Sequence, residues 1–249
     1  MDGQLLGEPG LQLVQRVMKR LLTAALGAVC LAGNAWAVPP ARPVVVELFT
    51  SQACSDCPPA DALLRQLQAT DPGLLALDLH VTYFNGPGWT DPFSSKMATD
   101  RQYWYASLRH ADQVFTPQAV VDGKAVVVGS RRTALLQAIM LARAATAQPL
   151  AQLAIAPERD GWRIAVSGEG PLSPAMITLF RFDAIDHTAV RGGENSGADL
   201  TEIHVVRAIA SLGQWSGEPV ARHVGPGPGS HIAVLVQQDD GTILAAASQ

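Results

Sequence analysis

The chain has 249 residues, with 18 Lys and Arg, 22 Asp and Glu and a formal net charge of −4. This mildly negative balance excludes the basic footprint that nucleic-acid-binding proteins show. Apolar residues make up 48% of the chain, which suits a globular protein, and the length suits one large domain or two small ones.

The first 37 residues are predicted to be a leader and an export signal. Lys19 and Arg20 precede an apolar run over residues 21–32, and Ala35-Trp36-Ala37 supplies small residues at a cleavage site. This is the secretory pattern. The alternative is a membrane anchor, but a run of about 12 residues is shorter than the ~20 that span a bilayer.

We expect Met18 to be the true start and the mature chain to begin near Val38. Cys30 lies in the apolar run and is expected to be removed, which leaves Cys54 and Cys57 as the cysteines of the mature protein. Export predicts a periplasmic or secreted protein without a stable membrane span, in a compartment where disulfides form and persist.

Residues 38–148 alternate between strand and helix patterns. Short apolar or β-branched runs predict strands at 44–50, 74–84, 118–122 and 124–128. Apolar residues at helical spacing predict helices at 60–70, 94–109 and 133–147. The Asp122-Gly123 pair between the last two strands is a hairpin signal. The order β-α-β-α-β-β-α predicts an α/β sheet with mixed strand directions.

The pattern changes around Gln148-Pro149, and residues 149–249 are predicted to be mostly strands. Strand-like runs occur at 151–156, 162–167, 176–183, 202–208 and 232–237. Asp160-Gly161 and Asp240-Gly241 are hairpin signals. We expect this second module to be a β-sandwich or a β-rich appendage.

A Cys-Ser-Asp-Cys tetrapeptide lies between the first predicted strand and the first predicted helix. Two thiols at this spacing predict dithiol–disulfide exchange, in which Cys54, expected to be the more exposed, attacks and Cys57 resolves the mixed disulfide. Such a pair carries electrons without a dissociable cofactor. A helix N-terminus favours the thiolate, whereas the negative charge of Asp56 opposes it. Pro58 and Pro59 predict that the regular helix starts near Pro58, with Cys57 biased away from helical angles.

Two loops could contribute to the same site. Trp89 lies in the loop 86–92, after the second predicted strand, on the side of an α/β sheet where sites gather. Trp89 is predicted to line the substrate groove, and the alternative is a packed loop tryptophan. The loop from Arg191 to Gly197 suggests anion binding, but it lacks the strand-to-helix spacing of phosphate motifs. A plain turn is therefore the favoured prediction there.

The element order, the cysteine pair and a later Thr116-Pro117 pair together resemble thioredoxin-like folds. The resemblance implies a cis-proline at Pro117 that faces the cysteines and, with Thr116, shapes the substrate groove. It also implies that Glu47, in the first strand, relays protons to the resolving thiol; the alternative is a hydrogen-bonded or edge-exposed glutamate. The expected fold is a thioredoxin-like α/β fold with a C-terminal β-rich, sandwich-like module.

A closer resemblance is carried by six segments: VELFTSQACSDCPPAD (46–61), GWTDPF (88–93), RQYWY (101–105), FTPQAVVDG (115–123), GENSGADL (193–200) and HVVRAIASLGQWSG (204–217). This set is similar to an uncharacterised family of secreted bacterial proteins with a thioredoxin-like N-terminal half. The family has no settled activity, so the resemblance supports the fold more than the function. The chain departs from the family at Ala53, where glycine is usual, and at Thr82 and Asn85, where acidic residues are usual.

Three alternatives to exchange remain for Cys54 and Cys57. A permanent disulfide could staple the turn, although so short a ring adds little loop-closure entropy. A periplasmic carrier could hold Cu(I) or another metal through the two thiolates, although the chain has no second C-x-x-C and its six histidines show no close pair at ligand spacing. His80 is predicted to be a hydrogen-bonded core residue. The third alternative is a non-catalytic binding module. The favoured partners are protein thiols or disulfides, and no metal site is predicted.

Overall fold

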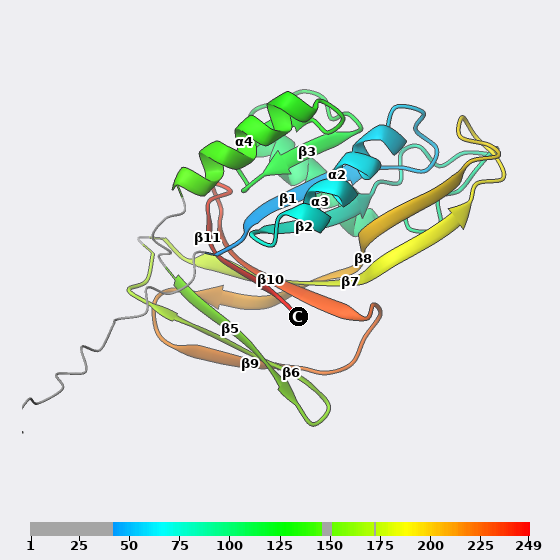
Figure 1. Ribbon diagram of the computed structural model, residues 1–249. Helices are drawn as coiled ribbons and strands as arrows, with labels where there is room; N and C mark the ends of the chain where they lie inside the picture. Colours follow the sequence, from blue (N-terminus) through cyan, green and yellow to red (C-terminus); the bar gives the residue numbers. More distant parts are fainter. Residues whose placement is uncertain (1–41, 146–150, 172) are drawn as a thin grey trace, which may run out of the picture. The chain divides into compact units, whose positions relative to one another are not determined.

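The described part of this computed structural model covers residues 42–145, 151–171 and 173–249 (Figure 1). The leader and signal predicted at 1–37 lie outside the described residues, as do the predicted boundary near Gln148 and the last residues of the helix predicted at 133–147. All of the described residues belong to one compact unit, Pro40–Gln249.

Three helices and eleven strands make up this described part. The helices are α2 (Pro58–Thr70), α3 (Lys96–Leu108) and α4 (Arg132–Ala145). The strands are β1 (Val44–Thr50), β2 (Leu74–His80), β3 (Gln118–Val121), β4 (Ala125–Val128), β5 (Ala151–Glu158), β6 (Gly161–Gly168), β7 (Ala175–Ala189), β8 (Asp199–Trp215), β9 (Val220–Val224), β10 (His231–Gln238) and β11 (Ile243–Ser248).

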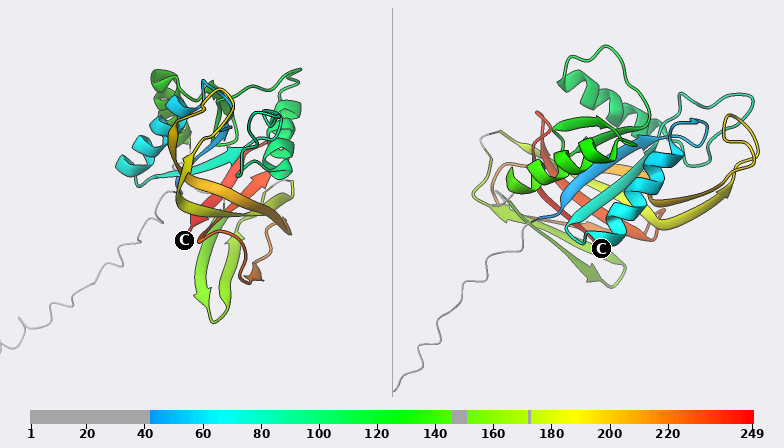
Figure 2. Two further views of the ribbon diagram at one scale, coloured as in Figure 1. Left: turned by 90° about the vertical axis from the view of Figure 1, so that its right-hand side faces the viewer. Right: turned by 45° about the horizontal axis from the view of Figure 1, so that its top comes forward.

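Eight of these strands form one mixed sheet in the order β11-β10-β7-β8-β2-β1-β3-β4, and a smaller sheet has the order β5-β6-β9 (Figures 1 and 2). β2 pairs in parallel with β1 on one side and with β8 on the other. The remaining pairs of the large sheet are antiparallel.

The predicted thioredoxin-like α/β fold with a separate sandwich-like module is wrong. The described residues are mostly β, and the large sheet takes strands from both predicted segments, because β8 lies beside β2 at the pair Asp78 and Val205. Strands that follow one another in sequence are usually neighbours in a sheet, and local patterns carry no sign of this distant pairing. The boundary drawn near Gln148 stays a prediction.

The helices cover the two faces of the large sheet around β1. Residues alternate along a strand between the two faces, so Val46 packs with α2 and α4, whereas Phe49 packs with Tyr105 of α3. Figure 2 shows α2 and α4 on one side of these strands and α3 on the other. Burying an apolar side chain of this size stabilises the fold by about 1.5–3 kcal/mol.

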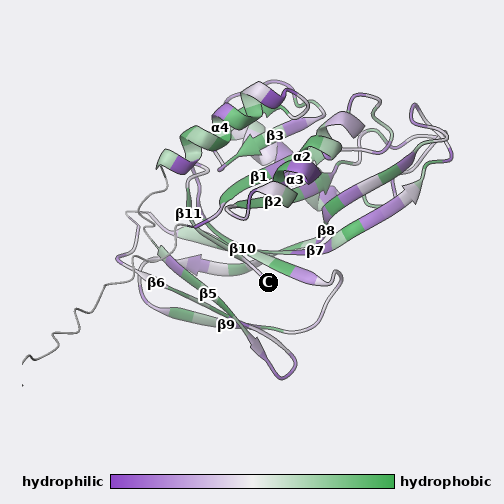
Figure 3. Ribbon diagram, in the orientation of Figure 1, coloured by the Kyte–Doolittle hydropathy of each residue, from purple (hydrophilic) through white to green (hydrophobic). Residues whose placement is uncertain are grey.

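A third core lies between the small sheet and the strands β7, β10 and β11. Ile164 and Val166 of the small sheet belong to the same buried cluster as Ile177 and Val234 of the large one. In Figure 3 the polar and hydrophobic colours alternate along the outer parts of β7 and β8, which extend beyond this core. These two strands therefore reach from the small-sheet side of the molecule to the β1–α2 side.

The three predicted hairpins are confirmed. Asp122-Gly123 lies in the turn between β3 and β4, and Asp240-Gly241 lies in the turn between β10 and β11. Asp160 ends the turn between β5 and β6, and Gly161 is the first residue of β6. Asp122 and Gly123 have φ values of 53° and 71°, which fits the turn type that an Asp-Gly pair favours in two-residue hairpins. None of the helices within the described ranges is long and apolar enough to cross a membrane.

Candidate functional site

The turn between β1 and α2 carries the two cysteines as a disulfide, with their Cα atoms 5.4 Å apart. β1 is buried along its whole length, so the cysteines follow directly on the core of the molecule. Cys54 is 3% exposed and Cys57 is 0% exposed, whereas Ser55 and Asp56 between them are exposed. The expected difference in exposure between the two cysteines is therefore small.

The helix that follows begins at Pro58, as predicted. Cys57 caps it with φ −81° and ψ −42°, which are helical angles, so the expected bias from Pro58 does not prevail. The N–H groups of Ala60 and Asp61 donate to the Cys57 carbonyl oxygen at 2.8 and 3.2 Å. These donors therefore bind a main-chain oxygen, and their contribution to stabilising a thiolate is smaller than the sequence suggested.

The bond between Thr116 and Pro117 is cis. β3 begins at the next residue, Gln118, which pairs with Phe49 near the end of β1. Gly129 lies between Pro117 and Ala60, since a Cβ atom added to it would be 3.5 Å from the Pro117 Cβ and 3.2 Å from the Ala60 Cβ. Thr116 and Pro117 are thus at the edge of the sheet from which the cysteine turn leaves; their role in a substrate groove stays a prediction.

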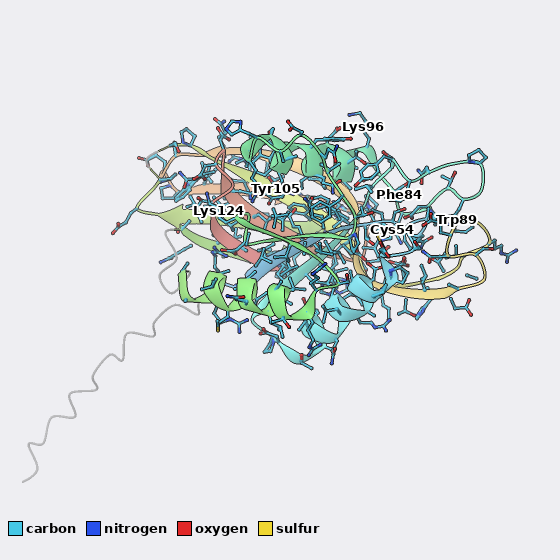
Figure 4. All side chains as sticks on the ribbon, turned by 90° about the horizontal axis from the view of Figure 1, so that it is seen from above. Cys54, Phe84, Trp89, Lys96, Tyr105 and Lys124 are labelled. Atoms are coloured by element: carbon cyan, nitrogen blue, oxygen red, sulfur yellow. A yellow bond between two sulfur atoms is a disulfide. The ribbon has the colours of Figure 1, made fainter. Side chains whose placement is uncertain are left out.

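Trp89 also reaches the cysteine turn. Its indole Nε1 donates to the side-chain oxygen of Gln52 at 3.3 Å, and Gln52 lies two residues before Cys54. The tryptophan is half-buried, and Figure 4 shows it in the same region as Cys54 and Phe84. The structure therefore brings Trp89 to the cysteines; whether it contacts a substrate stays a prediction.

Glu47 lies on the face of β1 that α3 covers. Its carboxylate accepts hydrogen bonds from Arg101 Nε, from Arg101 Nη2 at 2.8 Å and from the Tyr105 hydroxyl at 2.5 Å. Arg101 also donates to Gln237 of β10 at 2.9 Å. Within the described residues, none of the hydrogen bonds of Glu47 reaches the cysteine turn. The proton-relay role stays a prediction, while the observed contacts join β1 to α3 and β10.

Ionisable residues that the sequence reasoning did not bring together are buried beside the cysteine turn. We call them the acid–histidine cluster: Asp61, Asp78, His80, Asp91 and Glu202. Gln52 connects the turn to this cluster, because its N–H donates to Asp91 at 2.8 Å and its side-chain amide donates to Glu202 at 3.0 and 3.2 Å.

His80 is the centre of the acid–histidine cluster. Its Nδ1 atom is 2.7 Å from Asp91 Oδ2, and its Nε2 atom is 3.5 Å from Asp78 Oδ2. The prediction that His80 is a hydrogen-bonded core residue is confirmed. Thr50 at the end of β1 donates to Asp61 Oδ1 at 2.9 Å, which ties α2 to the same region.

The pairing of β2 with β8 explains the space that this cluster fills. These strands pair only at Asp78 and Val205, next to His204, whose φ of 53° departs from the extended conformation. His80 follows Asp78 in β2 and Glu202 precedes Val205 in β8, so neither residue takes part in the pairing of these two strands. His80 bonds to Asp91, and Thr50 and Gln52 donate to Asp61 and Glu202. Among the described residues, Asp78 Oδ1 and His80 Nε2 are buried without a hydrogen-bond partner.

Burial and mutual charge set the proton affinities in this cluster. Burial raises the pKa of Glu202 to about 7, and it raises the pKa of Asp61 well above its usual value, assisted by the nearby charge of Asp78. For His80, burial alone would lower the pKa, but Asp78 and Asp91 outweigh it and hold the pKa well above the ordinary value. The cluster therefore retains exchangeable protons near neutral pH.

A pocket of about 210 Å³ adjoins the cluster between the first turns of α2 and the start of β8. It is lined by Pro58, Asp61, Ala62, Arg65, Asp199, Leu200, Thr201 and Glu202. This volume holds several water molecules. Water in the pocket can therefore reach two of the carboxyl groups whose pKa is raised.

Residues 191–197 lie at the tip of the β7–β8 hairpin and form a turn. The sequence favoured a turn here over an anion-binding loop.

The sequence signals for the acid–histidine cluster were weak. Asp78 is a single acid in the apolar run LLALDLH, the same sign that drew attention to Glu47. Glu202 has no local signal, because only the pairing of β8 with β2 brings it to the site. Within the described ranges, no group of three or more His, Cys, Asp or Glu side chains is arranged to hold a metal ion.

Comparisons with known proteins agree with this architecture and assign no activity. Residues 45–237 match a family described as "Protein of unknown function (DUF1223)", and no curated protein matches the chain. A crystal structure of a protein from Agrobacterium tumefaciens is similar, with 27% identity and a TM-score of 0.73, over 84% of this chain and 94% of that one. HBP35 of Porphyromonas gingivalis shares the fold at 14% identity and a TM-score of 0.54, over 84% of this chain and 74% of that one.

Proposed function

The chain belongs to the DUF1223 family of proteins of unknown function, and from its cysteine site we propose that it exchanges electrons with the thiols or disulfides of other proteins. The expected membership of an uncharacterised family is confirmed, whereas the activity is our inference. We also propose that the chain is exported, as the signal expected at residues 1–37 indicates, so that exchange takes place in the periplasm or outside the cell.

The observation that carries this proposal is the position of the Cys54–Cys57 disulfide beside the acid–histidine cluster. A disulfide that closes so short a ring adds little to stability through loop closure, so stapling the turn is a poor reason to keep it. Reduction of a disulfide takes up protons as well as electrons. Gln52, two residues before Cys54, bonds to Asp91 and Glu202, and the buried Asp61 lies four residues after Cys57. Groups that hold protons are therefore next to the turn that carries the two cysteines.

The exchange proceeds in two steps. A substrate thiolate attacks Cys54 Sγ, the Cys54–Cys57 bond breaks, and the electron pair leaves on Cys57 Sγ, which takes a proton. The second substrate thiol loses its proton and attacks the substrate sulfur of the mixed disulfide, which releases Cys54 as a thiolate. The substrate is oxidised by two electrons to a disulfide, and the protein is reduced to a dithiol. Run backwards, the same steps reduce a substrate disulfide.

The fate of the Cys57 proton follows from burial. Cys57 is fully buried, and burial in apolar surroundings disfavours a thiolate, so the leaving sulfur needs a proton donor at hand. Glu202, with a pKa raised to about 7, exists in both protonation states at neutral pH. We assign the acid–histidine cluster and the water of the adjoining pocket the task of exchanging this proton with solvent.

The test is to trap the mixed disulfide. In a Cys57→Ala variant, Cys54 is a free thiol that attacks a substrate disulfide but has no partner to release it. Incubation with an unfolded protein that carries scrambled disulfides should give a covalent adduct through Cys54, seen as a mass increase that dithiothreitol reverses. The Cys54→Ala/Cys57→Ala double variant is the matched control and should form none. Equal absence of adduct in both variants would contradict the proposal.

A further inference from the structure

The tip of the β7–β8 hairpin, residues 190–198, lies against the cysteine turn, and we call it the strap. Asn195 Nδ2 donates to the carbonyl oxygens of Gln52 and Cys54, both at 2.9 Å. Glu194 Oε2 accepts a hydrogen bond from the N–H of Ser55 at 3.0 Å. One loop therefore contacts the chain just before, at and just after the attacked cysteine.

Two glycines let the strap approach this closely. A Cβ atom added to Gly192 would be 1.8 Å from the Gly88 carbonyl oxygen, a distance that no side chain tolerates. At Gly193, whose φ is 70°, an added Cβ would lie 3.2 Å from the Trp89 Cβ and 3.8 Å from the Ala53 Cβ. The strap is thus packed against both the tryptophan loop and the cysteine turn.

The strap is held together by its own main chain. The N–H of Val190 donates to Ala198 at 2.9 Å, the N–H of Gly197 donates to Val190 at 2.8 Å, and the N–H of Ala198 donates to Asn195 at 3.0 Å. The adjoining end of β7 is mostly half-buried or exposed, with Ile185 54% exposed. When the strap leaves the turn as one unit, it loses three hydrogen bonds to the turn, the glycine contacts and the burial of Val190, which is 2% exposed.

We propose that the strap covers the Cys54–Cys57 disulfide and has to move away before a thiolate can reach Cys54 Sγ. An attacking sulfur must approach along the S–S axis, but Cys54 is only 3% exposed, and the strap contacts the residues on either side of it. The inference rests on the proposed function for its biological meaning. Its physical content, that the strap protects this disulfide, is independent of any protein partner.

The test measures how fast dithiothreitol reduces the disulfide. One thiolate of the reagent attacks Cys54 Sγ and releases Cys57; its second thiol then attacks the reagent sulfur of the mixed disulfide, which releases Cys54 and leaves cyclic oxidised dithiothreitol. Alkylation of the freed thiols followed by mass measurement gives the rate. An Asn195→Ala variant lacks both hydrogen bonds to the turn and should be reduced about tenfold faster. This change corresponds to about 1.4 kcal/mol of lost stability of the closed state, the order expected for two such hydrogen bonds.

Matched variants separate the strap from general loosening of the loop. Ser196 is an exposed strap residue whose N–H bond to Gly193 is kept by alanine, so Ser196→Ala should leave the rate unchanged. Glu194→Gln keeps an acceptor for Ser55 and should match the unchanged protein, whereas Glu194→Ala should be reduced severalfold faster. Each rate is compared only between variants with the same far-ultraviolet circular dichroism and the same melting temperature.

The reduction rates of the two alanine variants decide whether the strap protects the disulfide. If Asn195→Ala and Glu194→Ala are both reduced at the rate of the unchanged protein, the strap does not protect the disulfide and the proposal is overturned. If Asn195→Ala lowers the melting temperature, the comparison of Glu194→Ala with Glu194→Gln decides instead. If dithiothreitol reduces the variants faster but the trapping experiment gives no adduct, the strap protects the disulfide and the exchange function is rejected. If the reduction rates are unchanged but an adduct forms, the exchange function is supported and the protection by the strap is rejected.

Discussion

Four carboxyl groups and one imidazole share the buried space beside the cysteine turn. His80 can balance only one negative charge, so all four acids cannot ionise together at low cost. The charge that survives is concentrated on Asp91, since the hydrogen bond and the positive charge of His80 outweigh burial and lower its pKa. Asp61, Asp78 and Glu202 have raised pKa values, so protons remain bound in a region where solvent is scarce.

Glu202 makes this arrangement measurable through stability. Its pKa in the folded protein is about 7, against an ordinary value of 4.5, so the folded state binds more protons than the unfolded state between these two values. Stability must therefore fall as pH rises through this window. The Glu202→Gln variant has no carboxyl group to ionise at this position. Between pH 4.5 and pH 8, the free energy of unfolding of the unchanged protein should therefore fall by up to about 3 kcal/mol more than that of the variant.

Urea unfolding at pH 4.5, 6 and 8 measures this difference. Glu169→Gln, a substitution of an exposed glutamate, is the matched control and should follow the pH dependence of the unchanged protein. If Glu202→Gln shows the same pH dependence of stability as the unchanged protein, Glu202 is ionised throughout this range and cannot exchange a proton with Cys57 near neutral pH.

The elements around the cysteines were predictable because their signals are local. Pro58 and Pro59 have no N–H to leave unpaired and so mark the first turn of α2. Ser95 caps α3 by accepting from Ala98 at 3.1 Å. The strand predicted at 74–84 ends earlier, at His80, and the chain then turns so that Asp91 Oδ2 lies 2.7 Å from His80 Nδ1. The strap was expected to be a turn, but its place over the cysteines depends on the length of β7 and β8.

Gly192 offers a test of how this hairpin docks on the tryptophan loop. Gly192→Ala would place a Cβ atom 1.8 Å from the Gly88 carbonyl oxygen and should push the strap away. We expect faster amide hydrogen exchange at Ser55, whose N–H donates to Glu194 of the strap, because an opened strap no longer accepts this hydrogen bond. Gly86→Ala is the control, since an added Cβ there meets nothing within 4 Å. Equal exchange in the two variants would show that the docking is not as tight as this contact requires.

The whole molecule is built around one long sheet, and this is the part that sequence patterns could not foresee. Thirteen-residue helices and short hairpins were visible as local periodicity, but the parallel contact of β2 with β8 joins Asp78 to Val205. Through the same contact, Glu202 and the strap lie close to the cysteine turn. Glu202 and the strap were therefore hidden in the topology, while Cys54 and Cys57 were evident from their spacing.

A truncation tests whether the N-terminal segment depends on this sheet. Residues 38–148 alone would lose Phe180, Phe182 and Leu235, which belong to the core that contains Phe49 and Tyr105. We expect this fragment to show no cooperative thermal transition, whereas residues 38–249 should unfold in a single one. A fragment that melts cooperatively near the temperature of the longer chain would show that the N-terminal segment is an independent domain.

The reduction potential of the Cys54–Cys57 pair tests the central claim most directly. Equilibration in glutathione buffers of graded composition, followed by alkylation and mass measurement, gives the fraction reduced at each potential. An exchange protein should reach equilibrium with glutathione and have a potential between roughly −120 and −270 mV. A value below about −300 mV, or a disulfide that never equilibrates even when Asn195→Ala removes the hydrogen bonds of the strap, would identify an inert structural disulfide and contradict the account.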